Sequence, residues 1–141
     1  LVVKKGSKYA NATSLADFSG AKVTAQLNTF HYSVIDQIPG VDKQTAMDNF
    51  PAMRVALQSG TIDAYVSELP EAISAQAANS DFVMVKLTDG FKTSPEDTQT
   101  AVGVRKDSSL TKEINEALKT ISSEERQQIM QEAIKNQPAA E

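Results

Sequence analysis

An acidic side chain stands at an unusual place in the stretch S-G-T-I-D-A-Y-V-S-E-L-P-E-A, residues 59–72. Glu68 follows the apolar run 62–66 and comes just before Pro70, so the chain there turns from a strand into a helix. Glu68 could cap that helix, where a carboxylate interacts favourably with the helix dipole by about 0.3 to 1 kcal/mol. It could instead meet a cation at the mouth of a crevice. Position alone does not separate these two interpretations.

A polar pair occupies a similar position earlier in the chain. Asn28 and Thr29 follow the alternating segment 21–27 and precede a segment with helical apolar spacing, residues 30–38. Backbone N–H groups and a hydroxyl at a helix start are suited to binding an anion. One acid and one anion-binding helix start, brought together by a fold, would suit a small zwitterion such as a free α-amino acid.

The pattern of the whole chain predicts how these residues are positioned. Helical and strand-like segments alternate through most of the length and end in two successive helices, which predicts an α/β fold with a mainly parallel sheet covered on both faces. Such sheets bind ligands at the carboxyl ends of their strands, so we expect the loops after 21–27 and after 62–66 to meet at one edge. The predicted strands are 1–3, 21–27, 43–47, 62–66, 82–87 and 100–104, and the predicted helices are 14–18, 30–38, 49–59, 69–79, 108–121 and 122–135.

Composition argues against several classes of function. The 141 residues contain 14 Lys and Arg against 18 Asp and Glu, for a net charge of -4, and no basic cluster alternates with aromatic residues, so we expect no nucleic-acid partner. The chain has no cysteine and one histidine, His31, which leaves little for zinc ligation or a Ser/His/Asp arrangement. We therefore expect no catalytic residue, no metal and no cofactor, and we expect His31 at the surface or at a pocket rim.

Three motifs in order resemble a known family. Asn28 and Thr29 follow a strand, A-L-x-x-G-x-x-D-A occupies residues 56–64, and V-G-V-R-K occupies residues 102–106. This combination, which covers essentially the whole chain, resembles the extracytoplasmic solute-binding proteins of polar amino-acid ABC transporters, solute-binding protein family 3. The resemblance implies a lobe of the type II periplasmic-binding-protein-like fold, in which Glu68 holds the ammonium group of the ligand.

The resemblance also implies a carboxylate-binding loop at Asn28, Thr29 and Phe30. The family has glycine where Asn28 stands and a hydroxyl residue where Phe30 stands, so we expect Thr29 and backbone N–H groups to hold the carboxylate and Phe30 to wall the pocket. Gln26 either points into the crevice, which we favour, or satisfies backbone groups. The predicted ligand-binding residues are Gln26, Asn28, Thr29, Phe30, Ser67 and Glu68.

The same resemblance predicts the domain organisation. Residues 1–105 would form ligand-binding lobe 2 with its hinge strands, and residues 106–141 would form C-terminal helices that pack on lobe 1. Family members begin with a first lobe that is largely missing here, so we expect this chain to be a fragment. The helices that carry Leu110 and Ile129 would then have exposed apolar faces, through which the fragment could dimerise.

The function implied is that of a receptor, not an enzyme. The lobe would close on a polar or charged amino acid and deliver it to the membrane permease of an ABC importer, outside the cytoplasm, in the periplasm or lipid-anchored at the outer face of the membrane. One alternative is a periplasmic enzyme of the cyclohexadienyl-dehydratase type, in which Glu68 is a general acid whose pKa is raised by burial. Another is a sensor domain of the same fold, fused to a kinase.

Overall fold

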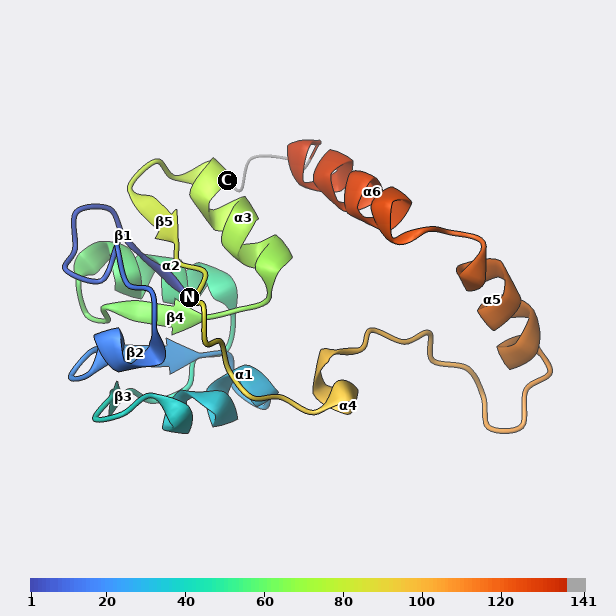
Figure 1. The fold of residues 1–141 in the computed structure, drawn as a ribbon, viewed down its shortest axis with the longest axis horizontal. Coiled ribbons are helices and arrows are strands. Elements are labelled where there is room, and N and C mark those ends of the chain that lie inside the picture. The colour runs from blue at the N-terminus through green and yellow to red at the C-terminus, as the bar shows by residue number, and fades with distance from the viewer. Residues whose placement is uncertain (137–141) are drawn as a thin grey trace. The chain divides into compact units, whose positions relative to one another are not determined.

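A computed structural model describes residues 1–136, which divide into two compact units, Leu1–Asp97 and a second unit that begins at Thr98. The first unit contains a five-stranded sheet in the order β3-β2-β4-β1-β5 (Figure 1). Its strands are β1 (Val2–Lys4), β2 (Lys22–Ala25), β3 (Asp42–Lys43), β4 (Ala64–Val66) and β5 (Phe82–Met84). Strand β2 is parallel to β3 and β4, whereas β1 is antiparallel to β4 and β5. Only β1 runs against the others, which confirms the predicted mainly parallel α/β sheet.

Helices cover both faces of this sheet because successive strand residues point to opposite sides. Val2 and Tyr65 lie on the face that packs against α2 (Phe50–Ser59) and α3 (Leu69–Ala78). Val3 and Val66 lie on the other face, which packs against η1 (Leu15–Phe18) and η2 (Val34–Gln37). The remaining helices of this part of the chain are α1 (Phe30–Ser33), directly before η2, and α4 (Pro95–Thr98).

Helix α2 shows why the predicted boundaries held. The Asn49 side chain accepts a hydrogen bond from the backbone N–H of Ala52 at 2.9 Å, as an N-cap should. Gly60 ends the helix with φ at 78°, a left-handed conformation that favours glycine, and its N–H bonds to the carbonyl groups of the last turn. This stop directs the chain into β4, the strand that leads to Glu68.

The second unit contains two helices, α5 (Leu110–Lys119) and α6 (Ser123–Lys135). A capping box begins α6, since Ser122 Oγ accepts from the Glu125 N–H and the Glu125 carboxylate accepts from the Ser122 N–H. Leu110 is 52% exposed and Ile129 is 57% exposed, which confirms the expected apolar exposure on these helices. Residues 137–141 of the predicted C-terminal region lie outside the described residues.

One predicted element was wrong. Residues 100–104 have alternating apolar side chains and were expected to form a strand, but they are exposed and have no strand assignment. A strand is held by hydrogen bonds to a neighbour, and within residues 1–136 no such ladder reaches this segment. The two units divide between Asp97 and Thr98, whereas the predicted division into a ligand-binding lobe and C-terminal helices after residue 105 stays a prediction. None of the described helices combines the length and the apolar character that a bilayer crossing requires.

Candidate ligand-binding site

The register between β2 and β4 brings the two predicted loops together. These strands are parallel neighbours in which Val23 pairs with Ala64 and Ala25 pairs with Val66. Both strands therefore end at the same edge of the sheet, and the chain leaves each of them from adjacent positions. An acid after β4 and a donor-rich turn after β2 are consequently neighbours.

The turn after β2 has a strained but well-supported backbone. Asn28 has φ at 61°, in the left-handed region where asparagine is tolerated better than most residues. Leu27 N–H donates to the Met47 carbonyl at 2.8 Å, and Thr29 Oγ1 donates to the Gln26 carbonyl at 2.7 Å. A positive φ favours glycine, the residue that the family named above has at this position, and asparagine is among the few other residues that tolerate it.

The Gln26 side chain and backbone both form contacts within the fold. Its Nε2 donates to the Asp48 carbonyl at 3.0 Å, and its backbone forms an isolated parallel bridge with Met47. The amide nitrogen thus satisfies a backbone group, as in the alternative that we did not favour.

Glu68 occupies the N-cap position of α3 without capping it through its side chain. The residue has extended backbone angles, φ at -67° and ψ at 160°, and within the described residues its carboxylate accepts no capping hydrogen bond. The side chain is 47% exposed, and Oε2 lies 3.7 Å from Nε2 of His31. Ser67, the residue before it, donates through Oγ to the Glu68 carbonyl at 3.1 Å. The carboxylate is therefore available at the edge where the two loops meet.

His31 joins this site although it was not among the predicted ligand-binding residues. It follows Phe30 in α1, and the two rings lie 4.1 Å apart, centroid to centroid, tilted by 32°. The His31 side chain is 14% exposed. Burial lowers the pKa of His31 below its ordinary value, and the Glu68 charge opposes the shift. Its place in the first turn after Thr29 was the only signal in the sequence, and that signal did not identify the partner.

An ion pair between α2 and α3 stabilises the first turn of α3, which directly follows Glu68. The guanidinium of Arg54, on α2, contacts both carboxylate oxygens of Glu71, on α3, at 2.8 to 3.0 Å. The Tyr65 hydroxyl lies 3.4 Å from Glu71 Oε1. Burial raises the pKa of Glu71, and Arg54 opposes the increase. Because Glu71 is in the first turn of α3, this network holds the backbone that carries Glu68.

Asp63 stabilises the opposite end of the same strand pair. Its carboxylate accepts a hydrogen bond from the Lys22 N–H at 2.9 Å, so it joins the starts of β2 and β4. Asp63, the acid of the A-L-x-x-G-x-x-D-A motif, therefore has a structural role at the start of β4.

An apolar hollow of about 240 Å³ lies on the other side of Glu68, toward β1 and β5. Ser67 and Leu69, which flank Glu68, contribute to its wall. The full lining comprises Leu1, Ser67, Leu69, Ala72, Met84, Val85, Lys86, Leu87, Gly90 and Phe91.

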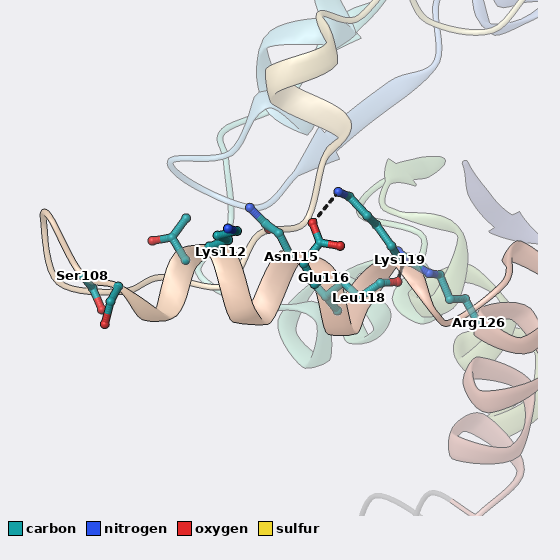
Figure 2. A pocket seen from close by; sticks show the side chains of 9 residues that line it. Ser108, Lys112, Asn115, Glu116, Leu118, Lys119 and Arg126 are labelled. Carbon is teal, nitrogen blue, oxygen red and sulfur yellow. Dashed lines mark hydrogen bonds and ion pairs between the residues drawn. The ribbon is translucent and has the colours of Figure 1, made fainter.

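A larger, shallow hollow of about 820 Å³ runs along α5 in the second unit (Figure 2). Its charged groups are largely engaged within the unit. Glu116 and Lys119 form an ion pair at 2.7 Å, and Arg126 donates to the carbonyl groups of Leu118 and Ile121. This hollow presents no convergent set of ligand-binding groups.

Across residues 1–136, no group of three or more His, Cys, Asp or Glu side chains could hold a metal ion.

Comparisons with known proteins agree with this fold. No family model matches the chain, and no curated protein matches it. Among solved structures, domain 2 of the protein named TmArgBP is 26% identical with a TM-score of 0.54, and the match covers 62% of this chain and 95% of that one.

Two longer structures match almost the whole chain. An amino-acid ABC transporter substrate-binding protein from Streptococcus pneumoniae, bound to L-arginine, is 26% identical with a TM-score of 0.76, covering 95% of this chain and 55% of that one. A mutant of ArgBP from T. maritima is 26% identical with a TM-score of 0.70, covering 96% and 56%. This chain thus spans about half the length of these two proteins. The resemblance predicted from the sequence is confirmed: the chain is structurally similar, over most of its length, to substrate-binding proteins of amino-acid ABC transporters.

Proposed function

We propose that this chain is the second lobe of an amino-acid receptor of an ABC importer. The observation that carries the proposal is the convergence of the Glu68 carboxylate and the 28–31 turn at one sheet edge, seen in the 3.7 Å approach of His31 to Glu68. Solved structures similar to most of this chain include a substrate-binding protein with L-arginine bound. A free α-amino acid has the two opposite charges that this edge can accept.

Each candidate residue has a proposed task. Glu68 binds the α-ammonium group, because its carboxylate is exposed and makes no capping hydrogen bond to α3 in the described structure. Thr29 and the backbone N–H groups around Asn28 bind the α-carboxylate. Phe30, half-buried beside His31, walls the pocket. Gln26 and Ser67 flank these groups and complete the polar edge.

A first lobe would supply the remaining ligand contacts. The two longer structures are nearly twice as long as the matched region, which supports a second body closing over this edge. Contacts from both lobes exist only when the crevice is shut, so ligand binding shifts the population toward the closed form. The closed form is then presented to a membrane permease outside the cytoplasm, with the receptor either periplasmic or lipid-anchored.

The exposed apolar residues of α5 and α6 fit the same arrangement. Leu110, Ile129 and Met130 are all exposed, and apolar stripes on amphipathic helices are normally covered. We propose that they pack on the first lobe. In its absence they provide a surface for association between copies of this chain.

The dehydratase alternative has less support. A general acid at Glu68 requires a desolvated carboxylate, whereas the Glu68 side chain is 47% exposed. The matched proteins named above are binding proteins.

Calorimetry with L-arginine tests the receptor function. The isolated chain offers only half of the contacts and should bind weakly or undetectably, since a smaller contact set leaves less to offset the entropy lost on association. A two-lobed protein, in which a first lobe precedes this chain, should bind an amino acid. Micromolar binding by the isolated chain would contradict the proposal, as would the failure of the two-lobed protein to bind any amino acid.

A further inference from the structure

We propose that His31 is a positioning residue for Glu68: the neutral imidazole holds the carboxylate ready for the ligand, and the protonated imidazole competes with the ligand's ammonium group. This inference rests on the proposed function, because it assigns the ammonium to Glu68. It makes amino-acid binding sensitive to the charge of a single side chain.

The contact between the two side chains carries the inference. His31 Nε2 lies 3.7 Å from Glu68 Oε2, too long for a good hydrogen bond but close enough for a strong effect of charge. Within the described residues, Glu68 makes no side-chain bond to the N–H groups of α3. His31 is therefore a polar side chain that the structure brings within ion-pair distance of this carboxylate.

The imidazole is held in place by its own surroundings. Its ring packs on Phe30, and Nδ1 is buried without a hydrogen-bond partner in the described part of the chain. Protonation would place an N–H on this buried atom with no acceptor, which is costly. The arrangement therefore favours the neutral form with its proton on Nε2, facing Glu68. Burial lowers the pKa of His31 accordingly.

The other charges near this pair are already balanced. On α3, Glu71 is the next acid after Glu68, and Arg54 of α2 pairs with it. On η2, which continues from the helix that carries His31, Asp36 pairs with Lys43 at 2.9 Å. Glu68 is the charged group that the structure brings against the imidazole, so the charge state of His31 is coupled mainly to Glu68.

Linkage sets the direction of the effect. An ammonium group bound at Glu68 would repel a positive charge on His31, so ligand binding lowers the pKa of His31 further and releases its proton. Affinity should therefore fall as the pH falls below the pKa of the ligand-free imidazole, at most about tenfold per pH unit. Above that pKa, affinity should be insensitive to His31.

The pair can be tested in the chain itself, without ligand. His31 is the only histidine, so its imidazole proton signals in an NMR pH titration need no assignment. Replacing the acid, Glu68→Gln, should lower the pKa of His31. A matched control, Asp81→Asn, removes an acid just before β5, the outermost strand on the side of the sheet away from β2 and β3. This control should leave the pKa of His31 unchanged. An unchanged pKa in Glu68→Gln would overturn the pairing.

The effect of ligand binding is tested in the two-lobed protein by calorimetry with L-arginine, between about pH 5 and pH 8, the range in which histidine titrates. The parent protein should lose affinity on acidification, and His31→Gln, which retains a polar group, should show a flatter profile. Identical profiles would overturn the inference and leave the proposed function intact. If the two-lobed protein bound no amino acid at any pH, the proposed function would fail, and the ligand-free titration would still decide whether the pair exists.

Discussion

Ala25 and Val66 are paired in parallel register at the ends of β2 and β4. This one relationship places the loops that carry His31 and Glu68 side by side, because parallel neighbours that end together release the chain at the same edge of the sheet. The site geometry thus follows from strand order and register, and it needs no contribution from the second unit.

The left-handed backbone at Asn28 gives a test of the turn after β2. With φ at 61°, Asn28→Ala should destabilise the first unit by about 1 kcal/mol, because a Cβ without a compensating polar group is strained in this region. Asn28→Gly should be neutral or slightly stabilising. Urea unfolding followed by circular dichroism measures both, and equal stabilities of the two variants would show that the turn has a different conformation.

The Arg54–Glu71 pair should be important for stability. Arg54→Met leaves Glu71, which is 11% exposed, without its counter-charge, and we expect a loss on the order of 2 to 4 kcal/mol, close to that for breaking a buried pair. The matched control is Lys43→Met, which leaves Asp36, a carboxylate that is 70% exposed, without its partner and should cost less than about 1 kcal/mol. Similar costs for the two substitutions in chemical denaturation would contradict the buried role of Glu71.

The environment of His31 predicts a pH dependence of stability. Its pKa in the folded chain is lowered from 6.5 by burial, so the unfolded chain binds the proton more readily. The contribution of His31 is fully present above pH 6.5 and is lost as the pH falls from there toward the folded-state pKa. The free energy of unfolding of the parent chain should therefore decrease on mild acidification more than that of His31→Gln. Parallel pH profiles for the two proteins would show that His31 is not desolvated.

Much of the fold could be predicted because local signals and burial agreed. Asn49, Pro51 and Gly60 specified the ends of α2, and the apolar run 62–66 specified β4, so the position of Glu68 at a strand-to-helix turn followed directly. The segment 100–104 had a similar apolar alternation and formed no strand. Alternation reports which side chains could share a face, but it does not supply a neighbouring strand with free hydrogen-bonding groups.

The candidate site was predictable in outline and not in its contacts. Strand alternation indicated that the loops after β2 and β4 would meet, and they do. The approach of His31 to Glu68 depends on ring packing against Phe30 and on register between distant segments, which no local pattern encodes. The hydrogen bond from the Gln26 amide to the Asp48 carbonyl could not be predicted either. A side chain at a strand end can bond either to a ligand or to the neighbouring backbone, and the local sequence does not decide between them. The binding roles of the six predicted residues remain predictions.

The ligand α-amino group tests the central claim most directly. L-arginine and 5-guanidinopentanoic acid differ only in that group. Titrating the two-lobed protein with each ligand, while following the NMR signals of residues 26–31 and 67–68, therefore isolates the role of Glu68. L-arginine should perturb both segments, its analogue should perturb mainly the segment around Asn28 and Thr29, and Glu68→Gln should abolish the difference between the two ligands. If both ligands gave the same perturbation in the parent two-lobed protein, or if Glu68→Gln left their difference intact, Glu68 would not be the ammonium site.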